Sequence, residues 1–307
     1  SISGIRGTIG GKEGENLTPN DILKFTRAYA QYIINNSTVH NPTVIIGRDS
    51  RMSGEMLESI ITGTLSALGI HSICLGLTTT PTTEIAVKHY KAQGGIIITA
   101  SHNPANWNAL KLLNNVGEFL TAEEGKEIEK YIETPIAEYA PYFAIGSIKH
   151  VSNFVEEHIE RVLNLPLVDK EAIQKANFNI VADVINSAGA VSIEPLLKAL
   201  GVEKIKILNS IPNGQFAHNP EPLAENLKDL SKAVIEEKAD LGIAVDPDVD
   251  RLALMMENGV LFGEEYTLVA VADYVLKHTP GNTVSNLSST AALKVITEQH
   301  GQNYFSS

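Results

Sequence analysis

Short apolar runs alternate with amphipathic segments along this chain, and that alternation limits its fold more than any other feature. The runs at 44–46, 71–75 and 96–99 have the length of buried strands, while residues 56–68 and 82–91 repeat their apolar positions with helical spacing. A strand that continues through a helix into the next strand usually pairs with it in parallel. The sequence therefore predicts an α/β protein with mixed, largely parallel sheets.

The alternation restarts twice further along, which predicts repeated α/β domains. Residues 134–147 contain two prolines and a glycine without a clear period, and we interpret them as a linker. We expect a first domain over residues 1–140, a second over 148–252 and part of a third over 253–307. The later strands are expected at 178–185, 204–208, 241–245, 251–256, 260–262 and 283–286, and the later helices at 153–164, 190–200, 224–237, 264–278 and 290–300.

The composition of the 307 residues restricts the partners that the chain can have. The formal net charge of −12 argues against general nucleic-acid binding, which needs a basic face, but local arginines or a metal ion could still bind an anionic substrate. The single cysteine, Cys74, fits a reducing cytosol, and no apolar segment approaches the ~20 residues of a membrane span. We expect a cytoplasmic protein that binds a small molecule, not a nucleic acid or a membrane. The first residue is not methionine, so we expect a trimmed start.

A serine loop follows one of the expected strands. Residues 99–104 read Thr-Ala-Ser-His-Asn-Pro, directly after an apolar run, and Lys111 lies ten positions beyond Ser101. This pattern is typical of a strand that delivers a nucleophile to a tight turn. His102 is an immediate neighbour and is poorly placed to deprotonate Ser101, and the chain has no Gly-x-Ser-x-Gly elbow, which weakens a hydrolase triad. An ordinary serine in a loop remains the alternative.

Three aspartates at spacing two, Asp246, Asp248 and Asp250, follow another expected strand. On an extended strand end this spacing places the carboxylates on one side, where they would hold a hard cation such as Mg²⁺. An EF-hand is excluded, because Arg251 occupies the sixth position, where glycine is needed. Two alternatives stay open. One is a phosphatase with Asp246 as nucleophile and Asp248 as acid, and the other is a solvated acidic turn.

Several cationic side chains are candidates for phosphate recognition and proton transfer. Arg6, Arg48 and Arg51 lie in segments with glycine close by that we expect to be loops, and an arginine there suits bidentate binding of phosphate. Surface salt bridges are the alternative for each of them. Lys111 could donate or accept a proton if nearby cations lower its pKa.

These motifs, in this order, resemble those of the α-D-phosphohexomutase family, and the resemblance covers essentially the whole chain. Family members interconvert the 1- and 6-phosphates of hexoses through an active-site phosphoserine and a hexose bisphosphate. The start of the chain and the Leu-Leu-Asn stretch at 112–114 look most like the phosphoglucosamine mutase branch. The segments that carry the resemblance are residues 3–7, 47–51, 99–104 with Lys111, 219–222 and 239–244.

The resemblance implies a role for each candidate residue, Mg²⁺ as cofactor and a hexose 1,6-bisphosphate as activator. Arg48, Arg51 and Asn103 are the candidate substrate- and phosphate-binding residues. Ser101 is the implied phosphoserine, and an oxygen on it joins Asp246, Asp248 and Asp250 as metal ligands. Arg6 and Lys111 are implied in proton transfer and charge stabilisation. His102 and Arg251 are expected to line the site.

The chain departs from the family pattern in two ways. Pro247 and Val249 replace the glycine or alanine that is usual between the metal ligands, so we expect a stiffer metal loop that still binds metal. Ala109 stands where glycine is common, which is a mild change. The family has four domains, and we expect this chain to end within the third, before the sugar-specificity loop. The best substrate prediction is conversion of glucosamine 6-phosphate to glucosamine 1-phosphate. The alternatives are phosphomannomutase, phosphoglucomutase or a non-catalytic sugar-phosphate-binding fragment. As an enzyme, this chain alone is expected to turn over poorly, and we expect a monomer or a homodimer.

Overall fold

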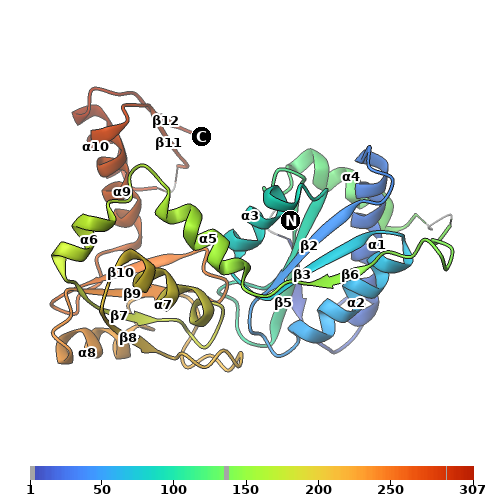
Figure 1. Ribbon diagram of the computed structural model, residues 1–307, viewed down its shortest axis with the longest axis horizontal. Helices are drawn as coiled ribbons and strands as arrows, with labels where there is room; N and C mark the ends of the chain where they lie inside the picture. The colour runs from blue at the N-terminus through green and yellow to red at the C-terminus, as the bar shows by residue number, and fades with distance from the viewer. Residues whose placement is uncertain (1–3, 135–137, 288) are drawn as a thin grey trace.

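A computed structural model describes residues 4–134, 138–287 and 289–307, and over these residues the strands form three sheets of six, four and two strands. The two larger sheets belong to separate α/β units that lie side by side, and a smaller unit at the C-terminal end adjoins the second of them (Figure 1). The prediction of an α/β protein with mixed, largely parallel sheets is confirmed.

The first sheet has the strand order β1-β5-β4-β2-β3-β6. Its centre is parallel, since β2 pairs in parallel with both β3 and β4, while β5 runs antiparallel to β4 and to β1. The strands are β1 (Ile5–Thr8), β2 (Thr43–Arg48), β3 (His71–Leu77), β4 (Gly94–Ile98), β5 (Trp107–Leu113) and β6 (Ile148–His150).

Helices cover both faces of this sheet. Ile46 and Ile96 pack in the core beneath α1, α2 and α4, whereas the adjacent Ile45 and Ile97 pack on the opposite face against α3. This division follows from the alternation of side chains along a strand. The helices are α1 (Pro19–Asn36), α2 (Gly54–Ala67), α3 (Thr80–Tyr90) and α4 (Ala122–Ile132).

The second sheet has the order β10-β9-β7-β8 and is parallel except for the edge strand β10. Val181 faces the core under α8, and its neighbours Ile180 and Ala182 face the core under α7. The elements are α5 (Phe154–Leu163), α6 (Lys170–Ala176), β7 (Asn179–Asp183), α7 (Gly189–Leu200), β8 (Lys204–Leu208), α8 (Lys228–Glu236), β9 (Leu241–Val245) and β10 (Leu252–Met256).

The C-terminal unit consists of two helices and a two-stranded parallel sheet (Figure 1). Its elements are α9 (Glu264–His278), β11 (Thr283–Ser285), α10 (Ala292–Gln299) and β12 (Tyr304–Ser306). Among the described helices, none combines the length and the apolar character that a membrane span requires.

Two local expectations are wrong. The segment around Arg6 is strand β1, not a loop, and its partner β5 at Trp107–Leu113 was not expected from the sequence. The run 260–262 forms only an isolated bridge, between Leu261 and Met255. Within the expected linker, residues 135–137 lie outside the described residues, and the remainder is irregular and bonded to the end of α2, for example through Gly146 N and Ser66 O.

The loops at the carboxyl ends of β2 and β3 meet the loops at the carboxyl ends of β7 and β9 where the two larger units join. Thr80 N donates to the carbonyl of Asp248, and Ser50 Oγ donates to the carbonyl of Asn186 at 2.7 Å. Ligands of α/β proteins bind at this end of the strands, so the junction is where a site is expected.

Candidate active site

Ser101 lies in the first turn after β4 and is directed at the second unit. Its side chain is nearly buried, and Ser101 Oγ lies 2.5 Å from Asp246 Oδ2 and 3.4 Å from His102 Nδ1. Its backbone has φ +49°, a left-handed conformation that costs an L-residue about 1–2 kcal/mol to adopt. Something in the surrounding structure must therefore hold this turn.

Arg51 supplies that support. It is fully buried, its Nε donates to Asp49 Oδ2 at 3.0 Å, and its Nη2 donates to the carbonyls of Ser101 at 2.6 Å and Asn103 at 2.7 Å. The two N–H groups of Nη1 donate to the carbonyls of Pro104 and Trp107. All five guanidinium donors are thereby used. In this structure Arg51 shapes the serine loop, and its donors are all engaged with protein groups.

The acidic loop is a turn rather than an extended strand end. Asp246 Oδ1 accepts from the backbone N–H groups of Asp250 and Arg251, at 3.1 and 3.0 Å, so the chain wraps around this carboxylate. Val249 has φ +61° in the same turn. The three carboxylates still converge, and one oxygen from each lies within 4.8 Å of the others. The turn, not the two-residue spacing, brings them together.

Lys111 carries the positive charge that faces this loop. Its Nζ projects from β5 and lies 2.7 Å from both Asp248 Oδ2 and Asp250 Oδ2. Burial alone would lower the pKa of Lys111, but the two carboxylates raise it above its usual value. The proton-transfer role considered for Lys111 depends on nearby cations that lower its pKa. The structure corrects that expectation, because the neighbours are anions and they keep the ammonium charged.

The acidic loop has the features of a site for a hard divalent cation. Burial, together with the charges of Asp248 and Asp250, raises the pKa of Asp246 to about 8. Oδ1 of Asp248 is buried and has no hydrogen-bond partner among the described residues. A dense group of carboxylate oxygens with one unsatisfied member suits Mg²⁺, which prefers oxygen ligands. The residues present therefore fit the metal that the sequence suggested.

Four further predicted residues flank the serine and acidic loops. Arg6 Nη1 donates to Asn103 Oδ1 at 3.1 Å, and Arg251 Nη1 lies 3.5 Å from Glu221 Oε1. His102 is half-buried, and burial together with the Arg251 guanidinium lowers the pKa of its imidazole. The structure thus brings Arg6, Asn103, His102 and Arg251 to the rim of the site.

Arg48 forms its ion pairs with α2 and not with the residues around Ser101. Its Nε lies 3.0 Å from Glu58 and its Nη2 lies 2.9 Å from Glu55, and both carboxylates belong to α2. Two glutamates already neutralise this guanidinium, so the prediction that it binds phosphate is not supported by its surroundings.

The structure adds two residues that sequence reasoning missed. Thr80 Oγ1 donates to Asp248 Oδ2 at 2.5 Å and thereby positions this carboxylate. Glu84, on the same helix α3, has a pKa raised to about 7, mainly by burial. The sequence held a signal for Thr80, since the threonine run 78–80 follows an expected parallel strand at its carboxyl end.

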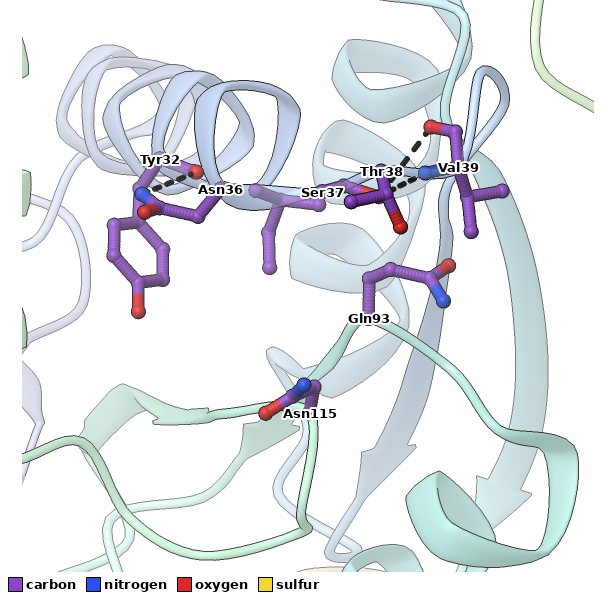
Figure 2. A pocket seen from close by; sticks show the side chains of 8 residues that line it. Tyr32, Asn36, Ser37, Thr38, Val39, Gln93 and Asn115 are labelled. Carbon is purple, nitrogen blue, oxygen red and sulfur yellow. Dashed lines mark hydrogen bonds between the residues drawn. The ribbon is translucent and has the colours of Figure 1, made fainter.

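A separate pocket of about 320 Å³ lies at the opposite end of the first sheet (Figure 2). Gln93 and Asn115 line it beside the end of α1, and Gln93 precedes β4 whereas Ser101 follows it. Its lining has no charged side chain, so it lacks the groups needed for phosphate chemistry.

Comparison with known protein families matches two domain models to this chain. Residues 2–138 match the phosphoglucomutase/phosphomannomutase alpha/beta/alpha domain I, and residues 156–259 match domain II of the same family. The first match contains Ser101 and Lys111, and the second contains the acidic loop.

Curated relatives and solved structures agree with these matches. A phosphoglucomutase/phosphomannomutase of Thermococcus kodakarensis is 35% identical, over 96% of this chain and 64% of its own length. A probable phosphoglucosamine mutase of Pyrococcus abyssi is 36% identical, over 95% of this chain and 61% of its own length. The crystal structure of a putative phosphomannomutase from Thermus thermophilus superimposes with a TM-score of 0.86 at 25% identity, over 100% of this chain and 68% of its own. This chain spans less than two thirds of the length of those two curated relatives.

Proposed function

This chain belongs to the phosphoglucomutase/phosphomannomutase family, and on that premise we propose that Ser101 exchanges a phosphoryl group with a hexose phosphate. The proposed reaction interconverts hexose 6-phosphate and hexose 1-phosphate through a phosphoserine and a hexose bisphosphate. One observation carries the proposal. Ser101 Oγ, on the first unit, lies 2.5 Å from Asp246 on the second, at the edge of a convergent carboxylate group.

The site residues fit the demands of phosphoryl transfer, which depends on positioning and charge neutralisation. In the forward half-reaction a sugar hydroxyl attacks phosphorus, the bond to Ser101 Oγ breaks, the sugar hydroxyl loses a proton and Ser101 Oγ takes one up. His102 is a proposed acceptor for that proton, because its lowered pKa keeps the imidazole neutral at pH 7. Lys111 and Arg6 supply fixed positive charge near the serine loop.

We propose Asp246, Asp248 and Asp250, with an oxygen on Ser101, as the residues that hold Mg²⁺. The metal, when bound, would offset part of the negative charge on the phosphoryl group. Lys111 forms ion pairs with two of these carboxylates, so metal binding requires Lys111 to share or release them. The released ammonium would then be available to the substrate.

The sugar is the finer part of the proposal. We infer glucosamine phosphate, supported by the sequence start and by relatives named as probable phosphoglucosamine mutases. Phosphomannomutase or phosphoglucomutase activity is the alternative, supported by the relative from Thermococcus kodakarensis. A hexose 1,6-bisphosphate would serve as activator, and the single cysteine supports a cytoplasmic setting.

Phosphoryl transfer from different donors tests this proposal. The chain is mixed with Mg²⁺ and the 1,6-bisphosphate of glucosamine, glucose or mannose, and the gain of one phosphoryl group is followed by intact mass. We expect the fastest gain with the glucosamine compound, none in Ser101→Ala, and unchanged gain in Ser59→Ala, whose serine is exposed on α2. A faster gain with the mannose or glucose compound would reassign the sugar. Equal labelling of Ser101→Ala would refute the role of Ser101.

A further inference from the structure

Glu58, Cys74 and His150 form a second group of metal-ligating side chains, which shares no residue with the site around Ser101. They come from three elements, α2, β3 and β6. One ligand atom from each, a carboxylate oxygen, the thiol sulfur and an imidazole nitrogen, lies within 4.8 Å of the other two. Three atoms at such separations can bind one ion.

The fold brings these side chains together. Strands β3 and β6 are parallel, Cys74 is the register partner of His150, and Val151 N donates to the Cys74 carbonyl at 2.9 Å. Register partners on neighbouring strands project their side chains to the same face. Cys74 belongs to the core that packs against α1 and α2, so this is the face on which α2 places Glu58. The grouping is a consequence of strand register and helix packing.

The ligand set favours a borderline-soft divalent cation. Thiolate, imidazole and carboxylate are the three ligand types that Zn²⁺ uses, and three protein ligands leave a fourth tetrahedral position for water. This ligand set disfavours Mg²⁺, because Mg²⁺ prefers oxygen ligands. The two clusters therefore differ in the metal that each suits.

Burial and the neighbouring Glu58 raise the pKa of the Cys74 thiol to about 12, so an ion has to displace a tightly held proton there, but the other charges and the access route are compatible with an ion. Arg48 Nε donates to Glu58 Oε2 at 3.0 Å, and a carboxylate held by one oxygen can still coordinate through the other. The same arginine is paired with Glu55, so its charge is offset. Cys74 is only 1% exposed, but His150 lies on the exposed edge strand β6 and offers an entry path.

We propose that Glu58, Cys74 and His150 form a Zn²⁺ site that fastens β6 to the body of the first sheet. Strand β6 has three residues and precedes α5, which begins the approach to the second sheet, so the ion would tie down the connection between the two units. On binding, the S–H bond of Cys74 breaks, a sulfur–metal bond forms, and the proton passes to solvent. No oxidation or reduction is involved.

Co²⁺ provides a probe that reports on Cys74 alone. A thiolate bound to Co²⁺ gives an intense near-ultraviolet charge-transfer band, whereas carboxylate ligands do not. The chain has one cysteine, so any such band identifies Cys74 and cannot arise from the acidic loop. We expect the band to appear when Co²⁺ is added to the reduced, metal-free chain, to bleach with Zn²⁺, which binds such sites more tightly, and to persist with excess Mg²⁺.

Matched variants complete the test. Cys74→Ser should abolish the band, and His150→Ala should weaken Co²⁺ affinity by about 100-fold, the upper end of the loss seen when only a supporting residue is removed. His40→Ala, in an exposed loop, and Asp246→Asn, in the acidic loop, should leave the band unchanged. If Cys74→Ser fails to fold, His150→Ala decides the matter, because it lies on the exposed edge strand. No band at saturating Co²⁺, or an unchanged Co²⁺ affinity in a titration of His150→Ala, would overturn the proposal.

Discussion

At the scale of single residues, the serine loop depends on one buried side chain, that of Arg51. Arg51 binds four carbonyls, three of them in the serine loop, and its counter-charge is the fully buried Asp49. Phe216, from the second unit, lies 5.0 Å below the guanidinium. The left-handed turn at Ser101 is therefore held from both units.

Replacing this arginine should be costly. Arg51→Met leaves Asp49 buried without its partner, and loss of one member of a buried pair costs about 3–5 kcal/mol of the free energy of unfolding. Urea denaturation measures the loss. Arg161→Met, which removes an exposed helical pair with Glu157, should leave the unfolding free energy nearly unchanged. Similar losses in the two variants would contradict the structural role of Arg51.

The raised pKa of Asp246 predicts a pH dependence of stability in the metal-free chain. The pKa rises from 3.8 to about 8 on folding, so the folded chain binds the proton more tightly. The corresponding stability is complete below pH ~4 and is lost as the pH rises towards 8. In chelator, the wild type should lose about 2 kcal/mol relative to Asp246→Asn between pH 6 and pH 8. A constant difference between the two chains would contradict this environment for Asp246.

At the scale of elements, glycines mark where loops of the two units touch. Gly214 has φ +71°, and a Cβ on it would lie 2.3 Å from the Ser50 carbonyl oxygen. Gly10 has φ +85° but open space around it, so the two positions share the backbone preference and differ in contact.

Alanine at these glycines should separate the two effects. Gly10→Ala should cost about 1 kcal/mol, the strain of the left-handed backbone alone. Gly214→Ala should cost about 1–3 kcal/mol more, because the clash forces the loop away from Ser50. Thermal unfolding of the two variants gives the comparison. Equal losses would show that the loops do not meet at Gly214.

The sequence was most informative where structure is local. Capping boxes place the starts of α1 and α4, at Thr18 with Asp21 and at Thr121 with Glu124, and each box lies within a few residues of sequence. Strand β1 was missed because its stability comes from pairing Arg6 with Ala109, about a hundred positions away. Local pattern carries no signal for such a partner.

The site was predictable in its chemistry but not in its contacts. The residue types at Ser101 and in the acidic loop indicated a nucleophile and a cation site. The roles of Arg51 and Lys111 depend on which groups face them, carbonyls in one case and carboxylates in the other. The charge of an arginine in the sequence does not tell whether its side chain supports a loop or binds phosphate.

At the scale of the whole molecule, the two units are joined through the site itself. Lys111 and Thr80 of the first unit both bond to Asp248 of the second, and Ser101 bonds to Asp246. Formation of the site and docking of the units are thus the same event.

Lys111→Met tests this coupling. It removes the charge that faces Asp248 and Asp250, so without metal the unfolding free energy should fall by about 3 kcal/mol. Mg²⁺ should stabilise this variant more than the wild type, because a cation can replace the missing ammonium. Lys24→Met, at an exposed pair with Glu133, serves as the control. No extra stabilisation by Mg²⁺ would contradict a cation site in the acidic loop.

Phosphopeptide mapping after incubation with Mg²⁺ and glucose 1,6-bisphosphate is the most direct test of the proposed phosphoryl exchange. The account predicts acid-stable phosphate on the peptide that contains Ser101, and its absence from Ser101→Ala. Acid-labile phosphate on Asp246, or no phosphate on Ser101, would contradict it.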